Sequence, residues 1–145
     1  MIVPDTNLLV YAYDSTSPQH DAARRWWEKA LSETTPVGIP WIVILAFTRL
    51  MTHPTVSTNP MGVGQVREVV AAWLEREQVR ILSPTLNTFH LFFDLLEEAD
   101  TGGNLSTDAM IASIALEHGG RVLSNDNDFS RFSALVWHNP IASKG

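Results

Sequence analysis

The chain has 145 residues, a hydrophobic content of 45% and a formal net charge of −6. This length and composition are typical of one globular domain, here residues 1–145, and they exclude a disordered chain. The sequence contains no cysteine, which excludes disulfides and thiolate metal sites. The acidic balance also argues against a protein that holds nucleic acid mainly through a broad basic surface.

Neither the N-terminus nor any apolar run indicates a membrane protein. The chain reaches Asp5 before any basic residue, which is unlike a signal peptide. The longest apolar run, residues 39–47, is far shorter than the ~20 residues of a membrane helix. We therefore expect a soluble, cytoplasmic protein that does not associate with a membrane.

The first segment predicts a buried strand that ends on polar residues. Apolar residues 2–4 are followed by Asp5, Thr6 and Asn7, and then by an apolar helical pattern. A buried parallel strand has this appearance when it delivers polar groups to the carboxyl edge of a sheet, where open α/β folds bind ligands. Asp5 taken alone has a second interpretation, because Asp commonly caps a following helix.

Helical patterns follow in the first half of the chain. The first begins at Ser17-Pro18, with Ser17 as the expected N-cap, and places Trp27 on an apolar face. Residues 41–51 are apolar almost all round and predict a buried helix, on which Arg49 must find an anionic partner or reach water. The remaining segments of this half are a connector or short strand at 36–40, a loop at 52–61 and an amphipathic helix at 66–74.

The second half alternates strands and helices. An aromatic stripe marks the helix at 86–99 and suits either the core or a dimer interface. The other expected elements are strands at 79–82 and 121–124, a helix at 104–117 and a possible last strand at 134–137. This alternation predicts an α/β fold with a central parallel sheet of about four to five strands and helices on both faces.

Acidic residues recur where strands end and helices begin. Asp126 and Asp128 follow a predicted strand, as Asp5 does, and Asp108 lies in the first turn of a helix. Each has an ordinary structural interpretation, as a turn residue or as a partner of the helix dipole. Three separate segments with the same feature favour convergence of these carboxylates at one edge of the sheet.

Converging carboxylates restrict the chemistry. They repel one another, so either some are protonated or a cation lies among them. Oxygen ligands without His or Cys select hard cations such as Mg²⁺ or Mn²⁺, which lower the pKa of an attacking water in phosphoester hydrolysis. An EF-hand beginning at Asp126 would require Gly and Glu where the chain has Arg131 and Trp137. The sequence has no P-loop and no nucleophile elbow.

With these residues in place, the chain resembles the PIN-domain nucleases over nearly its full length, and most closely the VapC-type toxins of bacterial toxin–antitoxin pairs. The matching segments are 3–7, 103–109 and 124–129, and residues 41–49 and 139–140 are also similar to the toxin branch. The resemblance implies a PIN-like α/β fold, RNA endonuclease activity with Mg²⁺ or Mn²⁺, dimerisation, and inhibition by a cognate antitoxin.

The resemblance also implies roles for particular residues. Asp5 and Asp108 are expected to be the principal metal ligands, Asp126 the later acid and Asp128 a nearby or outer ligand. Asp5, Asp108 and Asp126 would be catalytic. Polar residues that support the cluster in the family fall at Thr6 and Ser124.

One position departs from the family pattern. Many PIN domains have a glutamate where this chain has Ala46, and alanine cannot bind a metal. The leading hypothesis is a metal-dependent ribonuclease toxin. The alternatives are a catalytically impaired PIN domain that acts by binding RNA or protein, and a phosphatase acting on small phosphoesters. Arg49, one turn along the same helix face, is a candidate contact to the antitoxin, the RNA or an acid of the site.

Overall fold

The computed structural model describes residues 1–55 and 59–142. Its centre is a five-stranded sheet in the order β3-β2-β1-β4-β5, and every neighbouring pair of strands is parallel. The strands are β1 (Ile2–Pro4), β2 (Val37–Pro40), β3 (Val79–Leu82), β4 (Arg121–Leu123) and β5 (Trp137–His138). The predicted parallel sheet of four to five strands is therefore confirmed.

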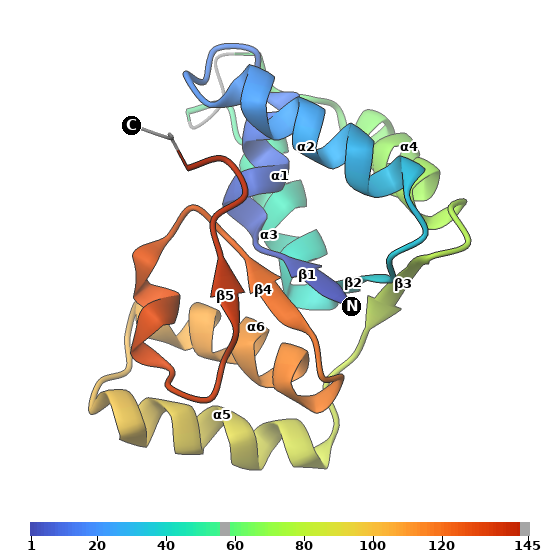
Figure 1. Cartoon of the computed structure of the whole chain (residues 1–145). Helices are drawn as coiled ribbons and strands as arrows, with labels where there is room; N and C mark the ends of the chain where they lie inside the picture. Colours follow the sequence, from blue (N-terminus) through green and yellow to red (C-terminus); the bar gives the residue numbers. More distant parts are fainter. Residues whose placement is uncertain (56–58, 143–145) are drawn as a thin grey trace.

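In the part of the chain that the structure describes, six helices flank this sheet. They are α1 (Thr6–Tyr13), α2 (His20–Ser32), α3 (Trp41–Thr52), α4 (Val63–Leu74), α5 (Leu86–Ala99) and α6 (Leu105–Glu117), and the 3₁₀ helix η1 (Asn127–Arg131) follows β4. Figure 1 shows α5 and α6 together on one side of the sheet, and α1, α2 and α4 on the other. Helices therefore cover both faces, as predicted. No helix in residues 1–55 or 59–142 is long and apolar enough to span a membrane.

An aromatic cluster forms the core under α1, α2, α3 and α4. The Trp73 ring lies 5.0 Å from Phe47 and 5.4 Å from Trp27 between centroids, and all three side chains are buried. The indole Nε1 of Trp73 donates a hydrogen bond of 2.8 Å to the Tyr13 hydroxyl. Trp27 therefore has the core role that its helical spacing predicts.

Helix α4 begins at Val63 and not at residue 66, and two further predicted boundaries are wrong because of local hydrogen bonds. Helix α2 begins at His20 and not at Ser17-Pro18, because Ser17 Oγ and its carbonyl accept from the backbone N–H groups of Gln19 and His20 in a preceding turn. The last strand was expected at 134–137 but occupies Trp137–His138. A turn in which Leu135 N–H donates to the Phe132 carbonyl takes up the first residues of the predicted strand.

The predicted burial of the helix at 41–51 is wrong for one face of α3. Trp41 and Leu45 are 53% and 67% exposed, and Arg49 follows them on the same face at a spacing of four residues. Arg49 reaches solvent, and no acidic group of the described residues lies within 4.0 Å of it. The predicted loop at 52–61 is confirmed for 53–55 and 59–61, while 56–58 lie outside the described residues.

The aromatic stripe of α5 is divided between core and surface. Leu95 is buried and Phe92 is half-buried, whereas Leu86, Phe89 and Phe93 are exposed. The stripe therefore packs inward along one edge only and leaves an apolar surface on the outer side of the helix.

Candidate metal centre

The carboxyl ends of β1 and β4 lie side by side because the two strands are parallel neighbours. Pro4 is paired with Leu123 in the register of the sheet, and the Asp5 N–H donates to the Leu123 carbonyl at 2.9 Å. The residues that follow each strand, Asp5 and Ser124, are thus held next to each other. This is the edge at which α/β sheets of this kind bind ligands.

Asp5 is buried and both of its carboxylate oxygens accept hydrogen bonds. Oδ1 accepts from the Thr6 backbone N–H at 2.7 Å, which makes Asp5 the N-cap of α1. Oδ2 accepts from the Ser124 hydroxyl at 2.6 Å. The capping interpretation is therefore confirmed, and the same side chain also faces the other acids. Thr6 supports it through its backbone N–H.

Ser124 connects the two halves of the site. Its hydroxyl donates to Asp5 Oδ2 and accepts from the backbone N–H of Asp126 at 2.9 Å. The Asn7 amide Nδ2 lies 3.5 Å from the same hydroxyl, and among the described residues the buried Asn7 Oδ1 has no hydrogen-bond partner. Sequence reasoning assigned no role to Asn7, because its contact to Ser124 joins residues more than one hundred positions apart.

Three of the four predicted acids meet at this edge. Carboxylate oxygens of Asp108, Asp126 and Asp128 all lie within 4.8 Å of one another. Asp108 projects from the first turn of α6, while Asp126 caps η1 by accepting the Asp128 N–H at 2.9 Å. Asp5 lies beside this group, close enough for its charge to act on Asp108.

The four aspartates repel one another, and their negative charges are not neutralised by a neighbouring cation of the described residues. Burial raises the pKa of the Asp5 carboxyl, and the Ser124 and Thr6 hydrogen bonds offset this only in part. Burial, followed by repulsion from Asp5, Asp126 and Asp128, raises the pKa of Asp108 to about 7. Within the described residues no Lys or Arg forms an ion pair with any of these acids. An oxygen-only site with this excess of charge fits a hard divalent cation.

Ala46 and Arg49 add no ligand to the cluster. Ala46 is half-buried on α3, a helix that contacts α6, and its methyl group cannot bind a cation. Arg49 lies on the exposed face of α3. Among the described residues, the acids that meet at this edge are Asp108, Asp126 and Asp128, with Asp5 beside them.

Replacing Ser124 with alanine is expected to destabilise the protein by about 1–3 kcal/mol, because the buried Asp5 carboxylate loses its hydroxyl donor and the Asp126 N–H loses its acceptor. Urea unfolding measures the change. Ser130→Ala is the matched control, since this exposed hydroxyl donates to the Asn127 carbonyl of its own turn. Equal losses in the two variants would show that Ser124 has no special structural role.

Comparison with known proteins agrees with this architecture. Residues 2–135 match the PIN domain. The chain is 35% identical to Ribonuclease VapC37 of Mycobacterium tuberculosis over 98% of this chain and 99% of that protein. It is 31% identical to Ribonuclease VapC33 of the same species over 97% and 99%.

Solved structures share the fold. Mycobacterium tuberculosis VapC20, described as a Sarcin-Ricin loop cleaving toxin, superposes with a TM-score of 0.68 at 19% identity, covering 90% of this chain and 93% of that one. VapBC2 from Rickettsia felis, bound to a DNA fragment from its promoter, gives 0.66 at 23% identity, covering 96% and 98%.

The parallel sheet, with carboxylates at its carboxyl edge, places this protein in the class of α/β proteins with an acidic, oxygen-only site. The chain belongs to the PIN domain family, and within that family to the VapC proteins.

Proposed function

We propose that residues 1–145 form one PIN-like domain that acts as a Mg²⁺- or Mn²⁺-dependent RNA endonuclease, the toxin of a toxin–antitoxin pair. The observation that carries the proposal is the meeting of Asp108, Asp126 and Asp128 beside Asp5. The names of the relatives support RNA as the substrate, because VapC37 and VapC33 are both described as ribonucleases.

The four aspartates would hold the cation, with Asp108, Asp126 and Asp128 nearest to one another. A divalent ion in such a site acidifies a water molecule and stabilises negative charge on a phosphodiester. Because the pKa of Asp108 is raised to about 7, this carboxyl carries a proton in a large share of the metal-free molecules at neutral pH, and it must release that proton before both of its oxygens can bind a cation. Ser124 and Thr6 keep the Asp5 carboxylate in one orientation.

The reaction is hydrolysis of an RNA phosphodiester. A water molecule attacks phosphorus, the bond to the leaving ribose oxygen breaks, and that oxygen takes up a proton. The acidic edge would hold the cation that brings the attacking water and the phosphate together, and such positioning accounts for a large part of catalysis in phosphoryl transfer. Asp5, Asp108 and Asp126 are the residues to which we assign this role.

A cognate antitoxin is the partner that this function requires. Similar structures include toxin–antitoxin complexes, some of them bound to DNA. Two apolar surfaces on this chain support protein–protein contact, one on α3 around Trp41 and Leu45 and one on α5 around Phe89 and Phe93. We assign these surfaces to the antitoxin and to a homodimer, in a protein that acts in the cytoplasm.

The second candidate is a PIN domain that binds RNA or protein without cleaving it. Ala46 favours this alternative, because it removes a carboxylate that many PIN domains have. The four remaining aspartates favour activity, since Mg²⁺ needs only one or two protein carboxylates and takes water and phosphate oxygens as its other ligands.

The test is cleavage of cellular RNA by the purified protein with Mg²⁺ or Mn²⁺, followed by sequencing of the new ends. Asp5→Ala and removal of the metal with EDTA are each expected to reduce cleavage by more than about 100-fold, because outer-shell changes alone cost 10- to 100-fold. The exposed Asp94 on α5 provides the control Asp94→Ala, which should cleave normally.

Two results would contradict the proposal. Full activity in EDTA, or full activity in Asp5→Ala, would exclude the aspartate-bound cation. Tight RNA binding without cleavage in any divalent metal would support the binding module instead, and release of phosphate from a monoester would support a phosphatase.

A further inference from the structure

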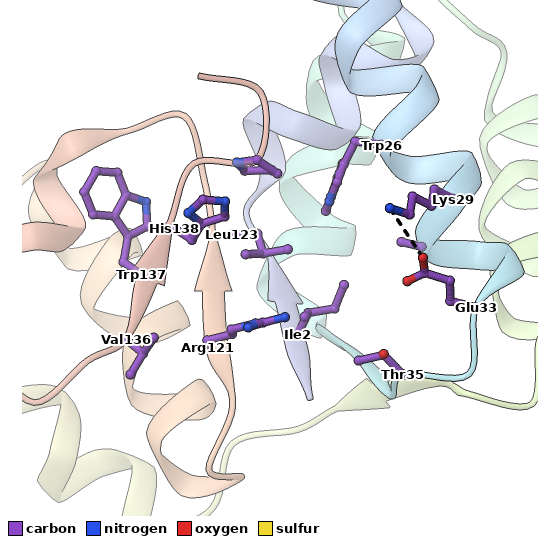
Figure 2. A pocket seen from close by; sticks show the side chains of 12 residues that line it. Ile2, Trp26, Lys29, Glu33, Thr35, Arg121, Leu123, Val136, Trp137 and His138 are labelled. Carbon is purple, nitrogen blue, oxygen red and sulfur yellow. Dashed lines mark ion pairs between the residues drawn. The ribbon is translucent and has the colours of Figure 1, made fainter. Parts of the chain in front are cut away.

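A second feature of the molecule is a hollow of ≈ 570 Å³ on the sheet face that carries α2. Figure 2 shows Ile2 of β1 and Leu123 of β4 on its floor, Trp26 and Lys29 of α2 on one side, and Arg121 of β4 and His138 of β5 on the other. None of the four aspartates lines this hollow. It is therefore separate from the acidic edge.

The topology explains why this part of the sheet is open. The steps from β1 to β2 and from β2 to β3 run in one direction across the sheet, and those from β3 to β4 and from β4 to β5 run in the other. Right-handed crossovers place the two sets of connections on opposite faces. The β4–β5 connection contains η1, which contacts α6. Within the described residues, no crossover helix covers β4 and β5 on the α2 face (Figure 1).

The residues that line the hollow include two cations, one acid (Glu33) and the ring of Trp26, in a protein whose net charge is −6. Arg121 is exposed, and no acid of the described residues lies within 4.0 Å of it. Lys29 is 3.7 Å from Glu33, but the two side chains are 75% and 47% exposed, so this ion pair is weak and exchangeable. The Trp26 ring is half-buried beside these cations.

This combination is suited to a nucleotide. Arg and Lys neutralise phosphate, and an aromatic ring stacks any base irrespective of sequence. The volume lies within the range of small-ligand pockets. A peptide would be a poorer occupant, because the two cations would need matching acids on it.

The hollow also lies along the strands that lead to the acids. Ile2 precedes Asp5 by three residues, and Arg121 precedes Ser124 by three. At 3.3 Å per residue each step corresponds to about 10 Å along the strand. We propose that the hollow binds one nucleotide of the RNA strand outside the cleaved phosphodiester, with its base on Trp26 and its phosphate on Arg121 and Lys29. This inference rests on the proposed ribonuclease function and adds a substrate-binding site to it.

The test is RNA affinity in a chain that cannot cleave. Asp5→Ala is the background, Mg²⁺ is present, and a short labelled single-stranded RNA pool of random sequence is the probe in fluorescence anisotropy. Adding Arg121→Gln should weaken binding about 5- to 20-fold and reduce the slope of log affinity against log salt by about 0.7. The matched control is Arg80→Gln, which removes an exposed arginine from β3 at the opposite edge of the sheet and should change neither quantity.

Trp26 is tested by a pair of substitutions. Trp26→Leu should weaken RNA binding about fivefold or more, whereas Trp26→Phe keeps an aromatic face and should retain most of the affinity. Far-UV circular dichroism and thermal unfolding establish that each variant is folded. Equal losses in Trp26→Leu and Trp26→Phe would contradict stacking.

The outcomes separate this inference from the proposed function. If the wild type cleaves RNA but Arg121→Gln and Arg80→Gln bind it equally, the hollow is not an RNA site and the ribonuclease proposal stands. If Arg121→Gln weakens RNA binding but the wild type cleaves no RNA, the ribonuclease proposal fails and the hollow remains an RNA site. Absence of RNA binding in the Asp5→Ala chain would overturn the inference. So would an Arg121→Gln variant that binds RNA normally but assembles less well with a protein partner.

Discussion

Replacing Asp108 with asparagine is expected to reduce RNA cleavage by more than about 100-fold and to stabilise the metal-free protein at about pH 8 by about 1–2 kcal/mol. Cleavage falls because asparagine lacks the charge that a cation requires. Stability rises because the substitution removes a carboxylate that is half-buried and repelled by Asp5, Asp126 and Asp128. The expected gain in stability is well below the free energy that corresponds to the full pKa shift, because solvent screens part of the repulsion.

The direction of the pH dependence follows from that raised pKa. The folded protein keeps a proton on Asp108 up to about pH 7, whereas the unfolded chain releases it near its ordinary value of 3.8. Between these values the folded state binds more protons, so the stability of the metal-free wild type falls as pH rises through this window. The stability that the folded state gains by keeping this proton on Asp108 is fully present below about pH 4 and is lost above about pH 7.

Urea unfolding of both chains in EDTA, at about pH 4 and about pH 8, measures this effect. The stability difference between Asp108→Asn and the wild type should grow with pH, and added Mg²⁺ should stabilise the wild type more than the variant. A variant that is less stable than the wild type at the higher pH would contradict the charge-repulsion account. Asp94→Asn, on the exposed face of α5, should show no such pH dependence.

Replacing Trp73 with alanine is expected to destabilise the protein by about 3–5 kcal/mol. Its side chain is 1% exposed and contacts the rings of Phe47, Trp27 and Tyr13, so its removal leaves a cavity in the centre of the aromatic cluster. The Tyr13 hydroxyl also loses the hydrogen bond from the indole Nε1.

Trp41→Ala is the control for this change, because the Trp41 side chain is 53% exposed on α3. Its loss should alter the free energy of unfolding of the monomer by less than about 1 kcal/mol. Urea titrations monitored by far-UV circular dichroism compare the two variants. A similar midpoint for both would mean that the aromatic cluster does not dominate the core.

Residue pattern alone was sufficient for most of the fold. The helix predicted at 86–99 and the strand predicted at 79–82 have the bounds of α5 and β3, because apolar periodicity and the Pro, Gly and Ser residues at their ends act locally. The parallel sheet followed from the alternation of strands and helices. Boundaries failed at Ser17 and at residues 134–137, where turn hydrogen bonds competed with the expected helix and strand.

The same pattern does not reveal which apolar residues remain in solvent. Residues 41–51 predict burial on all sides, but Trp41 and Leu45 are exposed. The sequence shows that a helix is apolar. Whether each of its faces is buried depends on which other elements of the fold pack against it. A helix face that binds another protein has the same kinds of apolar residues as a face that packs on the core, so the sequence does not distinguish them.

For the site, the residue pattern was sufficient to propose Asp5, Asp108, Asp126 and Asp128 as candidate ligands, because each follows a strand or begins a helix. Only the tertiary structure could bring Asp108 to Asp126 and Asp128, connect Ser124 to Asp5 across 119 positions, and leave the hollow beside Trp26 and Arg121. The physical reason is the order of the strands. Placing β4 next to β1 brings the two strand ends together, and right-handed crossovers leave one face of β4 and β5 without a helix from residues 1–55 or 59–142.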